Sequence, residues 1–170
     1  MDPMLEELYQ QHRRATEMLT ALRAAVRRLA QEGAGGPGLL GELSACRETL
    51  QTEVASHFQE EEAALFVVLG RRIGAEGGPI AVMLEEHREL RQAQAEYVAG
   101  LAAVDAGPGE AGPEALTAAA ERILQLLPPH IEKEEAVLFP MADELLDEGE
   151  WAEAHRLWRE AQAVAAGASA

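Results

Sequence analysis

The apolar residues of this 170-residue chain recur in steps of three and four, which is the spacing of one face of an α-helix. This rhythm runs through four long segments. Stretches rich in Gly and Pro separate them at residues 33–38, 74–79 and 105–113, and such stretches end helices and turn the chain. Four amphipathic helices with short connections are typical of an up-down-up-down four-helix bundle, so the sequence predicts an all-α fold of this kind.

A fifth segment, from about residue 150 to residue 165, has helical spacing of its own. Trp151 and Trp158 lie seven residues apart in it and therefore on one helical face. We expect a short additional C-terminal helix that packs across the bundle. The predicted organisation is a bundle domain over residues 1–148, with the C-terminal helix and tail over residues 149–170.

Composition argues against several functional classes. The formal net charge of −16 disfavours nucleic acid as a partner, because its phosphates would be repelled. The single cysteine, Cys46, excludes an internal disulfide framework, a Cys-based zinc site and a four-cysteine iron–sulfur cluster. The sequence shows no signal peptide and no apolar run long enough to span a bilayer, so we expect no membrane partner and a cytoplasmic location.

Two ten-residue stretches, HFQEEEAALF and HIEKEEAVLF, are near-copies of each other. The first begins at His57 and has Glu61 four residues later, and the second begins at His130 and has Glu134 at the same offset. On an α-helix this offset places both side chains on one face, a turn apart, so both can reach one metal ion. Two such pairs on facing helices would let a helical bundle hold two metal ions.

Two further histidines, His12 and His87, interrupt the apolar stripes of the first and third segments. Polar groups at core-facing positions are costly unless they are paired or coordinated. In an up-down-up-down bundle the first and third helices start at the end where the second and fourth finish. Both histidines and both motifs therefore fall in one layer, roughly 12–24 Å from that end at ~1.5 Å rise per residue. The predicted metal ligands are His12, His57, Glu61, His87, His130 and Glu134.

Neutral imidazoles and carboxylates suit iron, manganese or zinc. Two carboxylates can bridge two cations, four histidines divide as two per metal, and a bridging oxide or hydroxide would add further negative charge. This ligand count leaves open positions for solvent, dioxygen or another small molecule. A single inward-facing histidine is more often a core residue than a ligand, but the duplicated pairs, the two extra histidines and the shared layer together favour a metal site.

In order and spacing, these six residues resemble the ligands of the hemerythrin-like, HHE cation-binding family. The Glu-Glu-x-x-Leu-Phe continuation of both motifs, followed by Pro140 in the second copy, is similar as well. The resemblance covers about residues 3–146 and implies a four-helix bundle with a non-haem di-iron centre. Members of this family bind dioxygen, sense oxygen, iron or redox state, handle nitric oxide or peroxide, or take part in iron homeostasis.

The sequence departs from the oxygen-carrying members of that family at one position. Those members have a second histidine four residues after the one in the third helix, where this chain has Arg91. A guanidinium cation would not ligate iron, so the resemblance to an oxygen carrier is weaker than the resemblance to a di-metal protein. Four polar residues are candidates for a further ligand or a supporting contact, although packing or surface roles are the commoner alternative: Tyr9, Glu53, Gln94 and Tyr97.

The leading hypothesis is a protein that binds two iron ions, with zinc or manganese as substitutes, and that binds or senses dioxygen or a related small oxidant. One alternative is a di-iron enzyme that reduces peroxide or nitric oxide. Another is an iron-responsive regulatory module. The expected partners are these small molecules, and the sequence leaves open whether the protein is an enzyme.

The environments of a few other residues are also predicted. Pro128 and Pro129, directly before the second motif, either bend one helix or separate two shorter ones. Glu62 and Glu135 are predicted to be surface residues, with hydrogen bonds to the metal ligands as the less common alternative. His155 is predicted to be a surface residue.

Overall fold

The computed structural model describes residues 1–107 and 111–168. Residues 108–110 of the third predicted break and residues 169–170 of the predicted tail lie outside the described residues. Within the described ranges all regular secondary structure is helical, which confirms the predicted all-α class.

The described part of the chain forms five helical runs, and two of these contain π-helical turns. Three runs are single helices: α1 (Pro3–Glu32), α5 (Pro79–Asp105) and α8 (Glu148–Ala168). The second run is divided into α2 (Leu39–Thr49), η1 (Leu50–Val54), α3 (Ala55–Glu60), η2 (Glu61–Leu65) and α4 (Phe66–Ile73). The fourth run is divided into α6 (Ala111–Lys133), η3 (Glu134–Leu138) and α7 (Phe139–Leu145).

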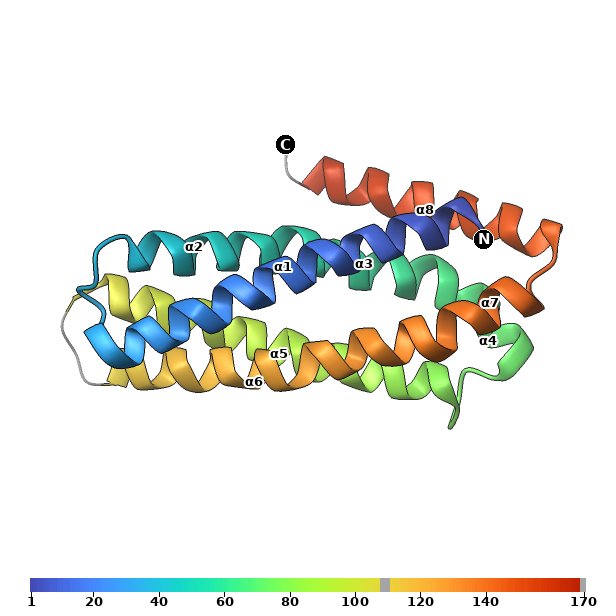
Figure 1. The fold of residues 1–170 in the computed structure, drawn as a ribbon. Coiled ribbons are helices and arrows are strands. Elements are labelled where there is room, and N and C mark those ends of the chain that lie inside the picture. The colour runs from blue at the N-terminus through green and yellow to red at the C-terminus, as the bar shows by residue number, and fades with distance from the viewer. Residues whose placement is uncertain (108–110, 169–170) are drawn as a thin grey trace.

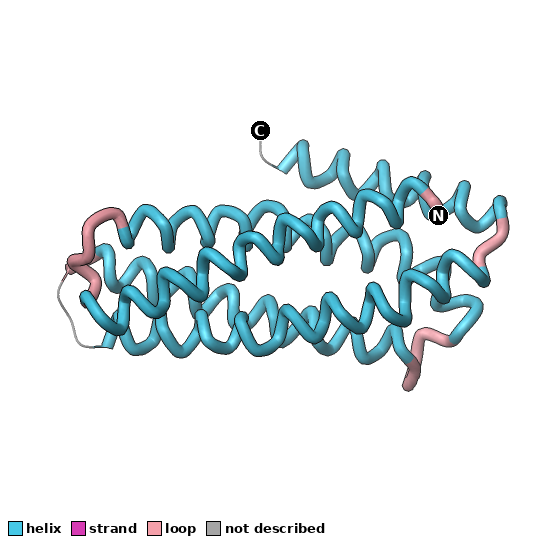
Figure 2. Tube along the Cα trace, viewed as in Figure 1, coloured by secondary structure: helices cyan, strands magenta, loops and turns pink. Residues whose placement is uncertain are grey.

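The first four runs lie along one long axis (Figure 1). α1 leads away from the end that holds the N-terminus, α2 to α4 return, α5 leads away again, and α6 and α7 return. The connections gather at the two ends of the molecule (Figure 2). Because α1 packs against α2 and α6, and α5 packs against the same two helices, the arrangement is consistent with a helical bundle.

Local chemistry explains where the helices begin and end. The Asp2 carboxylate accepts a hydrogen bond of 2.8 Å from the backbone N–H of Met4 and so caps α1, whose first residue is proline. α5 likewise has a proline, Pro79, as its first residue. At the other end of α1, Gly33 has a φ of 71°, which glycine adopts without steric cost. These signals match the Gly- and Pro-rich breaks of the sequence.

Two helices differ from the sequence-based expectation. α6 continues through Pro128 and Pro129, so the alternative of two shorter helices separated there is wrong. α8 has 21 residues and starts at Glu148, so it is longer than the predicted segment. It lies outside the other four runs, packed against α3, η2 and α4 (Figure 1).

The hydrophobic core consists of two separate clusters, and each of the four long runs contributes to both. The larger cluster includes Leu22, Leu43, Leu101 and Ile123. The smaller includes Leu5, Leu69, Met83 and Phe139. Each run passes from one cluster to the other where the sequence places its buried histidine, so a polar layer separates the clusters. None of the described helices is both long and apolar enough to cross a bilayer.

Candidate metal centre

Four imidazoles converge in the layer between the two apolar clusters. The Nε2 atoms of His12, on α1, and His57, on α3, are 3.0 Å apart. The Nε2 atoms of His87, on α5, and His130, on α6, are 3.1 Å apart. All four side chains are buried. The bundle thus brings two pairs of ring nitrogens together from helices that are distant in sequence.

Two carboxylates lie between the histidine pairs, and both residues are fully buried. Glu134 Oε2 is 3.1 Å from His12 Nε2, while its Oε1 is 3.2 Å from His130 Nε2, so the two oxygens of one carboxylate face different pairs. Glu61 Oε2 is 3.3 Å from His57 Nε2 and 3.4 Å from His87 Nε2. Both glutamates therefore have the placement of bridging groups.

The six side chains form two overlapping groups that could each hold a cation, and in each group the candidate ligand atoms lie within 4.8 Å of one another. The groups are His12, His57, Glu61 and Glu134, and Glu61, His87, His130 and Glu134. The two groups share both carboxylates.

The outer nitrogens of three imidazoles contact carboxylates. The Nδ1 contacts are His12 with Glu135 at 3.0 Å, His87 with Glu62 at 2.8 Å, and His130 with Glu86 at 3.0 Å. Because an ionised carboxylate only accepts hydrogen bonds, Nδ1 must carry the proton in each ring. In the neutral imidazole the Nε2 atom then holds a lone pair that faces the centre, which is the form that binds metals.

His57 differs, because its Nδ1 donates to an amide. The acceptor is Gln11 Oε1, at 2.7 Å. The amide orientation is fixed by its other end, since Gln11 Nε2 donates to Glu60 Oε2 at 3.0 Å. The Nε2 of His57 is therefore also left with a lone pair toward the centre.

The buried cluster stabilises positive charge. Burial alone would raise the pKa of Glu134, but the surrounding imidazoles hold it well below its usual range. Burial alone would lower the pKa of His87, but its contacts with Glu134, Glu61 and Glu62 raise it to about 10. The pKa of His12 is raised for the same reason, chiefly by Glu134. The centre thus favours whatever cation, proton or metal, lies between these groups.

Comparison with known families agrees with this geometry. The family model described as the hemerythrin HHE cation binding domain matches residues 4–142. The chain belongs to this hemerythrin family. Searches among curated proteins and among solved structures found no match. The family match and the buried His and Glu groups together make this hemerythrin-domain chain a cation-binding protein.

The surroundings of this hemerythrin centre include residues that the sequence analysis treated mainly as surface or did not single out. Glu62 and Glu135 are partly buried and contact imidazole Nδ1 atoms, which agrees with the less common alternative and not with the favoured surface position. Glu86 and Gln11 were not singled out at all. A signal existed for the first two: in both motifs a second glutamate directly follows the candidate ligand. Each of these second glutamates reaches the histidine of a neighbouring helix.

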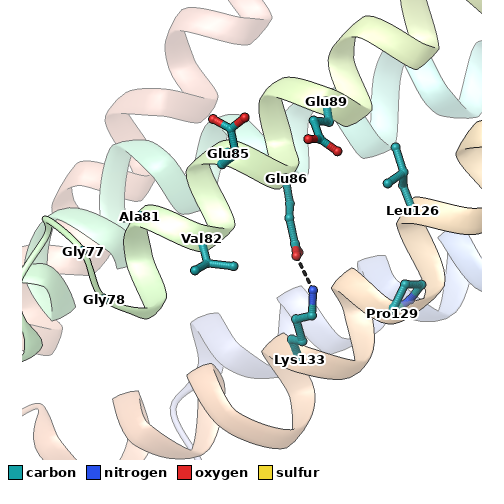
Figure 3. Close-up of a pocket in the computed structure, with 10 residues that line it drawn as sticks. All are labelled: Gly77, Gly78, Ala81, Val82, Glu85, Glu86, Glu89, Leu126, Pro129 and Lys133. Carbon is teal, nitrogen blue, oxygen red and sulfur yellow. Dashed lines mark hydrogen bonds and ion pairs between the residues drawn. The ribbon is translucent and has the colours of Figure 1, made fainter.

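Two basic side chains pair with carboxylates that contact the imidazole Nδ1 atoms. Arg91 Nη1 is 2.8 Å from Glu62 Oε1, and its guanidinium carbon lies 5.7 Å from the centroid of the Phe58 ring. Arg91 therefore pairs with Glu62, the carboxylate that contacts His87 Nδ1, and does not extend only into solvent. On the other side, Lys133 pairs with Glu86 in an open groove of about 470 Å³ between α5 and α6 (Figure 3).

None of the four candidate additional residues belongs to the two cation-binding groups found in the described part of the chain. Tyr9 donates its hydroxyl to the backbone oxygen of Glu135 at 3.4 Å, and Glu53 pairs with an arginine on α1. Tyr97 donates to the backbone oxygen of Leu43 at 2.9 Å. Gln94 is buried on α5. Tyr97 packs within the larger apolar cluster, and Tyr9 packs against the smaller one.

A small cavity of about 10 Å³ lies against the centre. His12, His57 and His130 line part of it, and most of the other lining residues are apolar. Its apolar residues are Ala15, Val54, Phe58, Leu127 and Ile131. Since a single water needs roughly 10–15 Å³, the cavity accepts only a molecule of about that size.

Proposed function

We propose that this hemerythrin-family chain binds two metal ions in the polar layer. His12 and His57 would hold one ion, His87 and His130 the other, and Glu61 and Glu134 would bridge both. The four long runs would form an up-down-up-down bundle, which brings the six ligands to one depth.

The observation that carries this proposal is a buried group of carboxylate oxygens and imidazole lone pairs. No oxygen of Glu61 or Glu134 has a hydrogen-bond partner among the described residues, although both carboxylates are completely buried. Within each histidine pair the two Nε2 atoms lie about 3 Å apart with their lone pairs inward. Buried anions and lone pairs at such distances are costly unless cations compensate them. The donor set, nitrogen and carboxylate oxygen, is one that first-row transition metals accept.

The hemerythrin family match favours iron among the metals that this donor set accepts. Each position would have four protein ligands, two imidazoles and two shared carboxylates. Four ligands satisfy a tetrahedral zinc ion, whereas iron would keep further positions for a bridging oxygen and a small ligand. We therefore propose two iron ions joined by a bridging oxide or hydroxide, with zinc or manganese as substitutes. Metal analysis after aerobic purification with iron supplied should give two irons per chain, and less than one would contradict the proposal.

The small, largely apolar cavity beside the centre marks where a very small uncharged ligand would approach it. Bound iron would supply a redox-active centre with an open position, and the surrounding apolar residues would exclude larger and charged molecules. The role that fits best is the binding or sensing of dioxygen or a related small oxidant. Peroxide and nitric oxide are of similar size, so the same cavity would also serve an enzyme that reduces them.

Filling the cavity tests this part of the proposal. Ala15→Val should slow the reaction of the reduced, iron-loaded protein with dioxygen at least several-fold, while the iron content stays at two per chain. The matched control is Ala119→Val, which adds the same methyl groups in the larger apolar cluster away from the layer. Equal rates for wild type and Ala15→Val would contradict the assignment of the cavity. Consumption of peroxide or nitric oxide over many turnovers would favour the enzymatic alternative.

A further inference from the structure

The hydrogen bond that orients His57 is the only one of the four that leads out of the bundle to the C-terminal helix in the described residues. Gln11 accepts from His57 Nδ1 through its oxygen and donates to Glu60 through its nitrogen. A rotation of the Gln11 amide would break both hydrogen bonds. The position of Gln11, and with it the direction of His57 Nε2, therefore depends on Glu60.

Glu60 is itself a buried carboxylate, with 7% of its surface exposed. Besides Gln11, it accepts hydrogen bonds from two residues of α8. Trp158 Nε1 lies 2.6 Å from Oε2, and Gln162 Nε2 lies 3.3 Å from Oε1. A buried carboxylate needs such donors, and α8 supplies two of the three that Glu60 has.

The rest of the α8 interface fixes the helix in place without reaching the centre. Arg71 pairs with Glu153 at 2.7 Å, and Arg72 pairs with Glu150 at 2.7 Å. These are exposed ion pairs, which individually contribute little. His155, predicted to be a surface residue, is instead partly buried and lies 2.8 Å from Asp2, the cap of α1. Glu62 and Glu86, which contact His87 and His130, make no hydrogen bond with α8 in the described structure. They pair instead with Arg91 and Lys133 of the bundle helices.

Given the two proposed metal positions, we propose that α8 is a positioning element for one of them. Trp158 donates a hydrogen bond to Glu60, and Glu60 accepts one from the Gln11 amide. Gln11 in turn accepts from His57 Nδ1 and so would orient His57 Nε2 toward the ion shared with His12. The two positions are therefore inequivalent: the His12–His57 position depends on the docking of the C-terminal helix, whereas the His87–His130 position does not. Any change that detaches α8 from the bundle would selectively lower the affinity for the ion at the His12–His57 position.

The test uses Co²⁺ as the probe, because it accepts the same ligands and its visible spectrum reports each bound ion. Metal-free, full-length protein is titrated in competition with a chelator, which gives the affinity of each of the two equivalents. Trp158→Phe keeps an aromatic side chain but removes the indole N–H that reaches Glu60, together with part of the ring volume. Loss of an outer contact to a metal-binding histidine typically costs 10–100-fold in affinity, so one equivalent should bind about tenfold more weakly while the other is unchanged.

Trp151→Phe is the matched control. Trp151 lies on the same helix, seven residues earlier, and contacts the same His155 ring edge-on, but it has no hydrogen bond to Glu60. Its two Co²⁺ affinities should equal those of wild type. Gln11→Ala should reproduce the selective loss with α8 in place, and this variant also provides the test if Trp158→Phe does not fold.

A spectroscopic signature separates positioning from general stability. In the Co²⁺ protein the exchangeable Nδ1–H resonances of the ligands are shifted by the paramagnetic ion, and Trp158→Phe should displace the one from His57 alone. Equal weakening of both equivalents, or no weakening of either, would overturn the role of α8. Failure of the wild type to bind Co²⁺ at all would instead count against the proposed metal centre, so the two failures are distinguishable.

Discussion

At the scale of single residues, the centre is built from side chains that each meet two partners. Every imidazole uses Nδ1 for an acceptor on a neighbouring helix and turns Nε2 inward. Glu134 faces a different histidine pair with each of its two oxygens. Because one carboxylate serves both pairs, changes at this residue should affect both proposed ions together.

Glu134→Gln tests this expectation. The substitution keeps the shape of the side chain but replaces a bridging oxygen with an amide N–H₂ that points at a cation. We expect the metal content after loading with iron to fall from two ions to less than one. Glu132→Gln is the control, because Glu132 lies two residues away on the exposed face. Two ions per chain in the Glu134 variant would show that this carboxylate is not a ligand.

The raised pKa of His87 predicts how the metal-free protein responds to pH. In the folded state this pKa is about 10, against a usual value of 6.5. A raised folded-state pKa stabilises the protein fully below the unfolded value and stops doing so above the folded one. The free energy of unfolding of the metal-free protein should therefore decrease as the pH rises from 6.5 toward 10.

Chemical denaturation at several pH values measures this decrease. His87→Gln should show a smaller decrease over the same range, because the titrating group is gone. A wild-type stability that stays level between these pH values, or a His87 variant with the same slope, would contradict the assigned pKa.

The sequence could predict the six candidate ligands but not most of their neighbours. Helical spacing and the repeated His-x-x-x-Glu offset were sufficient to select side chains that the structure brings within 4.8 Å in each group. Their role as metal ligands stays a prediction. Glu86 and Gln11 could not be found in this way, because their contacts depend on which helix lies beside them and at what rotation.

At the scale of helices, the centre coincides with local changes in helical winding. Two π-helical turns begin at the two buried glutamates of the layer, η2 at Glu61 and η3 at Glu134. A third, η1, ends at Val54, three residues before the first motif starts at His57. Such turns widen the helix and often occur at functional sites. Apolar periodicity predicts uninterrupted helices here, because one wide turn shifts the spacing too little to be recognised in a sequence.

A close approach between α5 and α6 is also a testable feature. A Cβ atom added at Gly100 of α5 would lie 2.8 Å from the backbone N of Leu116 on α6. Gly100→Ala should therefore force the helices apart and destabilise the protein by about 1–3 kcal/mol. Gly41→Ala, in α2, meets no atom within 4 Å and should stabilise the protein by about 0.5–1 kcal/mol. Denaturant unfolding of both variants gives the comparison, and a neutral Gly100→Ala would contradict the close helix contact.

At the scale of the whole molecule, two apolar clusters are joined through a polar layer. The sequence predicted the helical class and the breaks between the long runs, because Gly, Pro and apolar periodicity act locally. It predicted a C-terminal helix packed across the bundle with Trp151 and Trp158 on one face, but it underestimated the length of this helix. Its contacts with Glu60 and Asp2 could not be predicted, because they join residues far apart in the chain. A layer of this composition should make the fold depend on its bound ions.

Removal of metal should therefore lower the stability of the whole domain. A ligand that binds only the folded state stabilises it by about 2.7 kcal/mol when its concentration is a hundred times Kd. The melting temperature should fall when a chelator strips the protein and should recover when iron is restored. His130→Ala, which removes one proposed ligand, should show a smaller difference. Identical melting curves with and without metal would mean that no ion is bound between the two clusters.

The most direct measurement is the anomalous scattering of crystals of the iron-loaded protein, recorded on both sides of the iron absorption edge. We predict two anomalous peaks in the layer that disappear below the edge, one beside His12 and His57 and the other beside His87 and His130, with Glu61 and Glu134 between them. A map with no peak among these six side chains, at full occupancy of the crystal by folded protein, would contradict the central claim that the layer exists to hold a pair of cations.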